Sequence, residues 1–232
     1  MLTFRSLAQG INALLFPPIC PCCGDLQSNN ENLICAWCID NLFEQANPYG
    51  LDQCTEAFLP ENIAFQDALW RYDKGGYVQE LLVKLKYHGI ATIGVQLGCL
   101  LGIQLMKNPA FQNMEDHILI PVPLHHARKR KRGYNQSACI AEGISSVTGI
   151  PIIEEGSLKR SRNTHTQTGF NLNMRMANLK DAFTMQRPAT LADRFPVIVD
   201  DVFTTGTTTF ELAATIKPFT SKEIGIVTVA LA

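Results

Sequence analysis

Hydrophobic residues along the chain fall into short β-branched runs and into longer runs with helical spacing. The run Val-Ile-Val at 197–199 is typical of a strand buried on both faces of a parallel sheet, and 224–231 predicts a final strand. Strands that alternate with helices predict an α/β domain with parallel pairing and right-handed crossovers. Further strands are expected at 69–72, 117–122 and 150–153, and helices at 78–87, from residue 90 onward, at 137–147 and at 210–216.

One hydrophobic run, 89–106, carries no charged residue and spaces three glycines four residues apart. This pattern also occurs where helices pack within a membrane. However, polar residues interrupt the run, and its length is near the short limit for crossing a bilayer. We therefore expect no membrane span but a helix buried in a globular core, whose glycines allow close approach to the sheet.

Polar residues concentrate directly after the strand predicted at 197–199. Two acids stand at its expected end, and a turn of four threonines around Gly206 follows before the next helix. Backbone N–H groups at a helix start lack intrahelical acceptors and bind phosphate, and a glycine lets the backbone come close. Carboxylates accept hydrogen bonds from sugar hydroxyls, whereas a purely structural cap would need only one acid or threonine. The pattern predicts a ribose-5-phosphate site formed by Asp200, Asp201, Thr204, Thr205, Gly206, Thr207 and Thr208.

A second polar segment, 123–136, follows the strand predicted at 117–122 and is expected to be a loop. It contains five consecutive cations at 128–132. Such a run is often a solvated face, but ligands of parallel sheets gather at the carboxyl ends of the strands, so these cations should lie beside the threonine turn. There a pyrophosphate group or a polynucleotide backbone would need cations. We expect the pyrophosphate or anion loop to comprise Arg132, Gly133, Tyr134, Asn135 and Gln136.

A third polar segment, 158–167, reads as the start of a long irregular loop. Such a loop inside a compact domain is typical of a lid, and a lid that excludes water from a reactive intermediate suits glycosyl transfer. The residues of this flexible loop that could face an anion are Lys159, Arg160, Arg162, His165 and Gln167.

Four of the eight cysteines form two Cys-x-x-Cys pairs. The spacing is typical of a zinc ribbon, in which four thiolates hold a structural metal and leave no open position for catalysis. Disulfides are the alternative, but the first 18 residues lack the cleavage site of a signal peptide, so we expect a cytoplasmic chain with reduced thiols. Cys22 could replace one ligand, and Cys54 has no assigned role. The predicted zinc ligands are Cys20, Cys23, Cys35 and Cys38.

The length and the hydrophobic content allow one full core and a small appendage. We expect a zinc-ribbon module over 1–45, a linker over 46–66 and the main domain over 67–232. The net charge of −1 at pH 7 excludes a global field that would attract nucleic acid or a membrane surface. Cations therefore matter only where they cluster locally.

Several segments in chain order carry a resemblance to a known family. They are 16–20 (Phe-Pro-Pro-Ile-Cys), 84–89 (Lys-Leu-Lys-Tyr-His-Gly), 132–136 (Arg-Gly-Tyr-Asn-Gln), 158–167 with Arg175 and Asn178, and the acidic signature at 200–208. Together they resemble the ComF/GntX family, a phosphoribosyltransferase-like branch with an N-terminal cysteine module, over nearly the whole chain. The acidic signature is similar to that of type I phosphoribosyltransferases for phosphoribosyl pyrophosphate. The resemblance implies a type I phosphoribosyltransferase fold with a small zinc ribbon, and a role in natural competence, DNA uptake or growth on DNA.

By this resemblance the protein would bind phosphoribosyl pyrophosphate with Mg²⁺ and could transfer the phosphoribosyl group to an acceptor that the sequence does not identify. No residue stands out as the group that activates an acceptor base. Thr204 stands where purine-salvage enzymes often place an aspartate, which argues against 6-oxopurine acceptors. The alternative is a non-catalytic module that binds single-stranded DNA or a helicase partner through the cations at 128–132 and 159–162. A third reading is a regulator that binds the nucleotide without consuming it.

Overall fold

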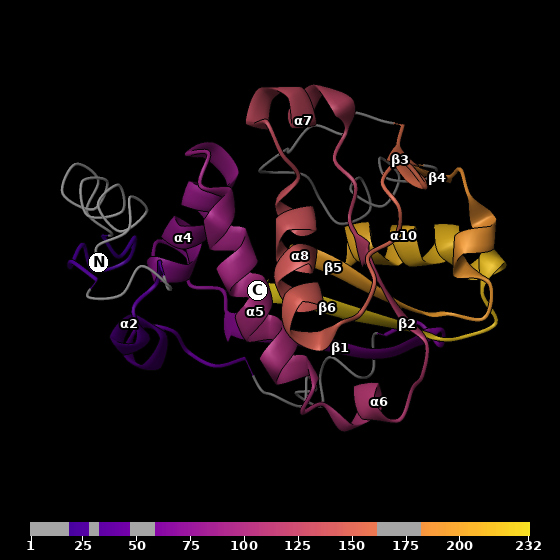
Figure 1. Ribbon diagram of the computed structural model, residues 1–232, viewed down its shortest axis with the longest axis horizontal. Coiled ribbons are helices and arrows are strands. Elements are labelled where there is room, and N and C mark those ends of the chain that lie inside the picture. Colours follow the sequence, from indigo (N-terminus) through magenta and orange to yellow (C-terminus); the bar gives the residue numbers. More distant parts are fainter. Residues whose placement is uncertain (1–18, 28–32, 47–58, 162–181) are drawn as a thin grey trace, which may run out of the picture. The chain divides into compact units, whose positions relative to one another are not determined.

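The computed structural model describes residues 19–27, 33–46, 59–161 and 182–232 (Figure 1). The chain divides into two compact units, Met1–Phe43 and Glu44–Ala232. In the N-terminal unit, helix α2 (Ala36–Asn41) begins directly after Cys35, the first cysteine of the second pair. Ile19 and Leu26 form an isolated antiparallel bridge in the same unit. The predicted loop residues Arg162, His165 and Gln167, the motif residues Arg175 and Asn178, and Cys54 lie outside the described residues.

The second unit is built on a four-stranded sheet with the order β1-β6-β5-β2, in which every neighbouring pair is parallel. The central strands β5 and β6 are almost entirely buried, as their β-branched runs predict. This mainly parallel sheet, flanked by helices, confirms the α/β class that the sequence predicts. The strands are β1 (Ile63–Arg71), β2 (His117–Pro121), β5 (Phe195–Phe203) and β6 (Ile224–Leu231).

Strand boundaries differ from the sequence expectation at three places. Strand β5 continues to Phe203, so the two acids lie within the strand rather than after it. Strand β1 begins at Ile63, inside the range 46–66 expected as a linker. The strand expected at 150–153 is reduced to one parallel bridge between Ile152 and Leu119, because Pro151 has no N–H to extend the ladder.

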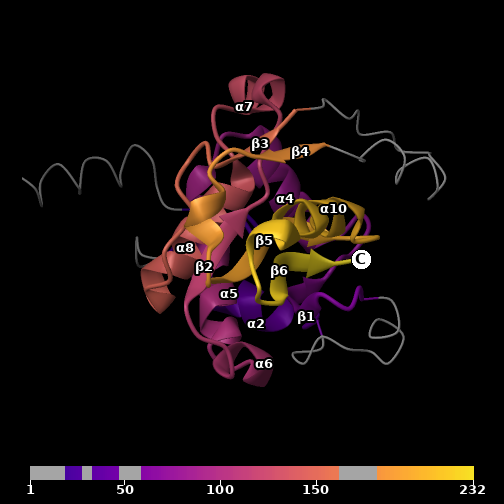
Figure 2. The ribbon, with the colours of Figure 1, turned by 90° about the vertical axis from the view of Figure 1, so that its right-hand side faces the viewer.

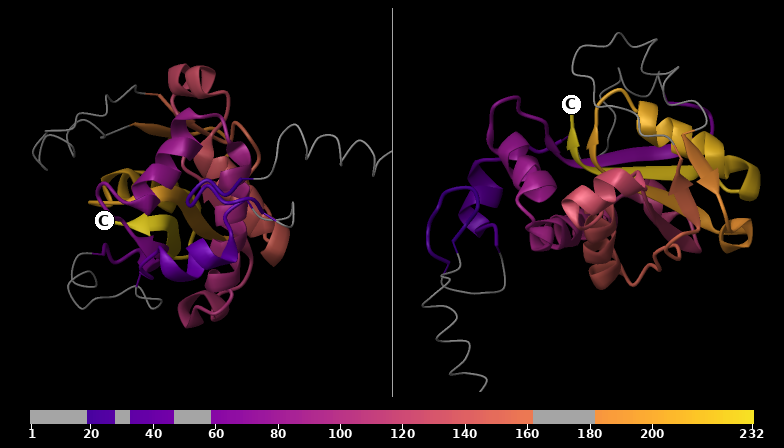
Figure 3. Two further views of the ribbon diagram at one scale, coloured as in Figure 1. Left: turned by 90° about the vertical axis from the view of Figure 1, so that its left-hand side faces the viewer. Right: turned by 90° about the horizontal axis from the view of Figure 1, so that it is seen from above.

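Helices cover both faces of this sheet (Figure 3): α10 lies on one face, and α5 and α8 lie on the other. A short antiparallel pair, β3 (Leu158–Arg160) with β4 (Phe183–Met185), lies near α7 and packs against α10 (Figure 2). The helices are α4 (Tyr77–Tyr87), α5 (Ala91–Leu105), α6 (Pro109–Gln112), α7 (His126–Arg132), α8 (Gln136–Thr148) and α10 (Thr207–Ile216), with 3-10 turns η1 (Pro188–Leu191) and η2 (Lys217–Phe219).

The glycines of α5 contact another helix and not the sheet, which corrects the sequence expectation. A side chain on Gly98 would overlap the carbonyl oxygen of Ile140 in α8, and one on Gly143 of α8 would overlap the carbonyl oxygen of Val95. The two helices therefore approach backbone to backbone along their glycines. Among the described helices, none is both long enough and apolar enough to cross a membrane.

Candidate functional site

The acid pair of β5 lies at the carboxyl-terminal half of a central strand. Both carboxylates are buried, with 8 % of Asp200 and 6 % of Asp201 exposed. The hydroxyl of Ser137, at the start of α8, donates to Asp200 Oδ1 at 2.9 Å. The carboxylate of Asp201 forms an ion pair with the ammonium group of Lys86, in the last turn of α4. The two neighbouring acids thus have different partners, one neutral and one cationic.

Burial governs the ionisation of this pair. Loss of solvent, reinforced by the negative charge of Asp201, raises the pKa of Asp200 to about 7. Burial also disfavours the charged form of Lys86, but the carboxylates of Asp201 and Asp200 outweigh it and raise the pKa of Lys86. Lys86 therefore stays cationic, whereas Asp200 can change its charge near neutral pH.

Beyond the acids, the chain turns sharply into α10. Gly206 has φ +69°, and a side chain there would overlap the rings of Phe210 and Phe203, so the turn requires glycine. The hydroxyls of Thr205 and Thr207 lie 2.6 Å apart. The amide groups of the first turn of α10 have no acceptor within the helix, so this turn presents N–H and hydroxyl donors beside the acids.

The predicted anion loop holds itself in place with most of its polar side chains. Asn135 Nδ2 donates to the carbonyl oxygen of Val122 at 3.0 Å, and Asn135 Oδ1 accepts from the N–H of Ser137 at 3.2 Å, which caps α8. The hydroxyl of Tyr134 donates to the carbonyl oxygen of Leu85 in α4. Because these two side chains hold the loop in shape, an anion at this loop would be bound mainly by cationic side chains.

The cation run is helical, which corrects the expectation of a loop over 123–136. Helix α7 begins after His125, whose Nδ1 accepts from the N–H of Ala127, and ends at Gly133 with φ +88°. Its last residue, Arg132, donates to Gln136 and lies over the ring of Tyr87 at 5.7 Å. The exposed cations of α7 are thus carried on a short, capped helix.

Strand β3 brings a further cation toward the same end of the sheet. Arg160 lies over the ring of Phe183 at 5.4 Å. Burial and the positive charge of Arg128 lower the pKa of Arg160, against the attraction of Asp200. Lys159, next to it, is exposed. The predicted residues 159 and 160 therefore lie on a strand, and Arg160 is close enough to Asp200 for the two charges to interact.

The N-terminal unit gathers the four predicted zinc ligands. Their sulfur atoms all lie within 4.8 Å of one another; Cys20 and Cys38 are 3.8 Å apart, and Cys23 and Cys35 are 3.9 Å apart. A tetrahedral zinc with Zn–S bonds of about 2.3 Å separates its sulfurs by about 3.8 Å. Burial opposes the Cys20 thiolate, but backbone N–H donors lower the pKa of Cys20 to about 6. The cluster therefore fits a structural zinc ion, and Cys22 is not part of it.

Lys86 and Ser137 contact the acid pair, and the sequence assigns neither of them to the site. The sequence predicts a helix over 78–87, and lysines in the last turn of a helix are favoured by its dipole, so they need no partner elsewhere in the chain. In the structure Lys84 pairs with Glu80 of its own helix at 2.8 Å, whereas Lys86 pairs with β5. The sequence shows the lysine at position 86, but it does not show that Lys86 pairs with Asp201, because the two residues are far apart along the chain.

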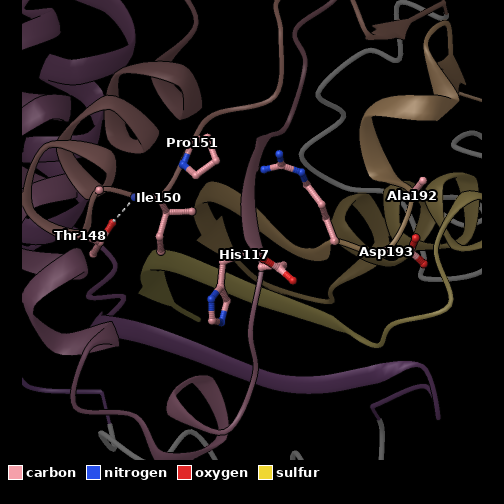
Figure 4. Close-up of a pocket in the computed structure, with 9 residues that line it drawn as sticks. His117, Thr148, Ile150, Pro151, Ala192 and Asp193 are labelled. Carbon is pink, nitrogen blue, oxygen red and sulfur yellow. Dashed lines mark hydrogen bonds between the residues drawn. The ribbon is translucent and has the colours of Figure 1, made fainter.

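The described residues also form a hollow of about 420 Å³ at the opposite end of the sheet (Figure 4). It lies where β2 and β5 begin, and none of the predicted site residues lines it. Because ligands of parallel sheets gather at the carboxyl ends of strands, this hollow is separate from the candidate site. Its lining residues are Asp116, His117, Thr148, Gly149, Ile150, Pro151, Ala192, Asp193 and Arg194.

Comparison with known proteins gives two kinds of relative. The chain is 37% identical over 112 residues to "Competence protein F" of Haemophilus influenzae, covering 47% of each chain. It is 34% identical over 135 residues to "DNA utilization protein YhgH" of Escherichia coli O157:H7, covering 57% of this chain and 58% of the relative. These matches span about half the length of the curated relatives. No protein-family model matches the chain.

A solved structure described as the allosteric regulatory enzyme of purine biosynthesis also matches. The TM-score is 0.40 and the sequence identity 16%, over 62% of this chain and 29% of that chain. A likeness at this level does not bear on function.

Proposed function

We propose that the chain is a ComF-like protein that acts in competence or DNA utilisation and binds a phosphoribosyl pyrophosphate-type ligand at the carboxyl end of β5; its similarity to Competence protein F and to DNA utilization protein YhgH supports the role. One observation carries the proposal. The buried acids Asp200 and Asp201 lead through Gly206 directly into the first turn of α10, so acceptors for sugar hydroxyls and donors for phosphate follow one another along a single turn.

Each part of the proposed site has a task set by its chemistry. The N–H groups and hydroxyls of 204–208 would hold the 5′-phosphate, and the acid pair would accept hydrogen bonds from the ribose hydroxyls. Arg132 and Arg160 would face the pyrophosphate, whose growing negative charge they would stabilise as the bond to C1′ breaks. Mg²⁺ bound with the ligand would neutralise part of that charge. The acceptor of the phosphoribosyl group is left open.

A second candidate function rests on the cations of α7. Arg130 and Lys131 are exposed, and Arg128 lies close enough to Arg160 for the two charges to interact. Such a surface suits the phosphates of single-stranded DNA, with or without catalysis at the acid pair. A protein that binds DNA in this way would lose affinity steeply as the salt concentration rises, whereas one small ligand with Mg²⁺ should stay bound at moderate salt.

Calorimetric titration of phosphoribosyl pyrophosphate with Mg²⁺ tests the first function. Wild type should bind, and Asp200→Asn/Asp201→Asn should bind at least about tenfold more weakly, because neutral amides accept sugar hydroxyls less strongly than carboxylates do. Asp193→Asn, an exposed acid at the opposite end of the sheet, is the matched control and should bind like wild type. Absence of binding to wild type would reject the ribose-phosphate site.

A further inference from the structure

The ion pair between Lys86 and Asp201 joins an element outside the acid signature to its centre. The side chain of Lys86 is 27 % exposed and the side chain of Asp201 is 8 % exposed, so the pair is largely removed from water. Partly buried charges of this kind are costly unless they are paired, and removing one partner leaves the other uncompensated. Lys86 thus supplies the positive charge that the buried Asp201 needs.

The surroundings of Lys86 contain charges of both signs. Asp200 attracts its ammonium group, as Asp201 does, and Arg132 repels it. Two acids from β5 therefore meet one lysine from α4 and one arginine from the end of α7. Lys86 is thus the cation that pairs with the acids, whereas Arg132, which repels it, belongs to the predicted anion loop.

The backbone around Lys86 is held from both sides. The carbonyl oxygen of Leu85 accepts from the hydroxyl of Tyr134, and the ring of Tyr87 contacts the guanidinium of Arg132. These contacts tie the last turn of α4 to the anion loop, which places the ammonium group at the acids. Lys84, two residues earlier, instead pairs within its own helix.

We propose that Lys86 is the resident counter-cation of the acid pair and a specificity-determining residue: it keeps the carboxylates available to sugar hydroxyls and keeps divalent cations from binding to them directly. This inference rests on the proposed ribose-phosphate site. Two neighbouring carboxylates would otherwise attract a hard divalent cation, whose ligands are oxygen atoms. With Lys86 in place, the pair already has a positive partner, and Mg²⁺ is left to the pyrophosphate of the ligand.

The experiment compares two probes, MnCl₂ alone and ribose 5-phosphate without metal, by calorimetry on the full chain. Lys86→Met should bind Mn²⁺ about tenfold more tightly than wild type, because the unpaired Asp201 carboxylate then seeks another cation, and should bind ribose 5-phosphate about tenfold more weakly. Lys86→Gln, which retains a donor for Asp201, is the second neutral variant in case Lys86→Met does not fold. Lys86→Arg retains the charge and should restrict Mn²⁺ as wild type does.

Two further variants separate this role from a general effect on stability. Lys84→Met neutralises the neighbouring lysine and should leave both affinities unchanged. Lys86→Met/Asp201→Asn removes both charges and should lose the gained Mn²⁺ affinity, which a merely loosened fold would not explain. If both neutral Lys86 variants bind Mn²⁺ no better than wild type, the proposed role of Lys86 is wrong. If wild type fails to bind ribose 5-phosphate, the ribose-phosphate site fails, while the Mn²⁺ comparison still decides whether Lys86 excludes metal.

Discussion

Asp200 and Asp201 are adjacent residues of the same type, yet the structure gives them different chemistry. Asp200 accepts from the neutral Ser137, whereas Asp201 pairs with Lys86. The sequence predicts the two acids and the glycine turn, because these residues are contiguous and Gly206 adopts a conformation that favours glycine. It does not predict Lys86 or Ser137 as their partners, because both come from other helices and local spacing carries no information about such contacts.

The stability of the protein should depend on pH through Asp200. Its pKa is raised from an ordinary value of 3.8 to about 7, so the folded state holds a proton that the unfolded state releases over this range. The protonated Asp200 carboxyl group therefore stabilises the folded state fully below the unfolded pKa, and this contribution is lost as the pH rises through the folded pKa. Between the two pKa values, the folding equilibrium constant falls by up to about tenfold for each pH unit. Asp200→Asn lacks the titrating group.

Denaturant unfolding of wild type and Asp200→Asn from pH 5 to pH 8 measures this effect. The free energy of unfolding of wild type should fall relative to Asp200→Asn as the pH increases. Parallel pH profiles for the two proteins would show that Asp200 ionises normally and that its burial has no energetic consequence.

For the helices, the sequence contains signals for where each one begins and ends, but not for the surface against which it packs. The run of cations at 128–132 is expected to be a loop, but it is part of a short helix that begins after His125 and ends at Gly133. These two residues are the sequence signals for the ends of the helix. The partner of the glycine-bearing α5 is a different case. Helix α5 packs against α8 at Gly143, and no local sequence pattern shows whether a glycine-bearing helix packs against another helix or against a sheet.

At the scale of the whole molecule, alternation of strands and helices is sufficient to predict the parallel α/β class, because parallel strands require crossover connections. The antiparallel pairing of Leu158–Arg160 with Phe183–Met185 could not be predicted, since a long segment separates two very short strands. The cysteine spacing did predict the four-sulfur cluster of the N-terminal unit, because the two pairs are local turns that need only one common metal.

We expect the purified protein to carry about one zinc ion per chain, held by the four clustered cysteines. Cys20→Ser/Cys35→Ser should lose the metal, and residues 19–43 should become sensitive to protease, because so small a unit depends on metal for folding. Cys139→Ser, which changes a buried thiol outside the cluster, should retain it. Emission spectroscopy measures the zinc content of each protein. A wild type without zinc, or a double variant that retains zinc, would contradict the assignment.

The most direct test of the central claim is a crystal structure of the protein with phosphoribosyl pyrophosphate and Mg²⁺. We predict the 5′-phosphate on the N–H groups of Thr207 and Thr208 and the ribose hydroxyls on Asp200 and Asp201. A ligand bound only by the cations of α7, with the turn at Gly206 free of phosphate, would contradict the claim.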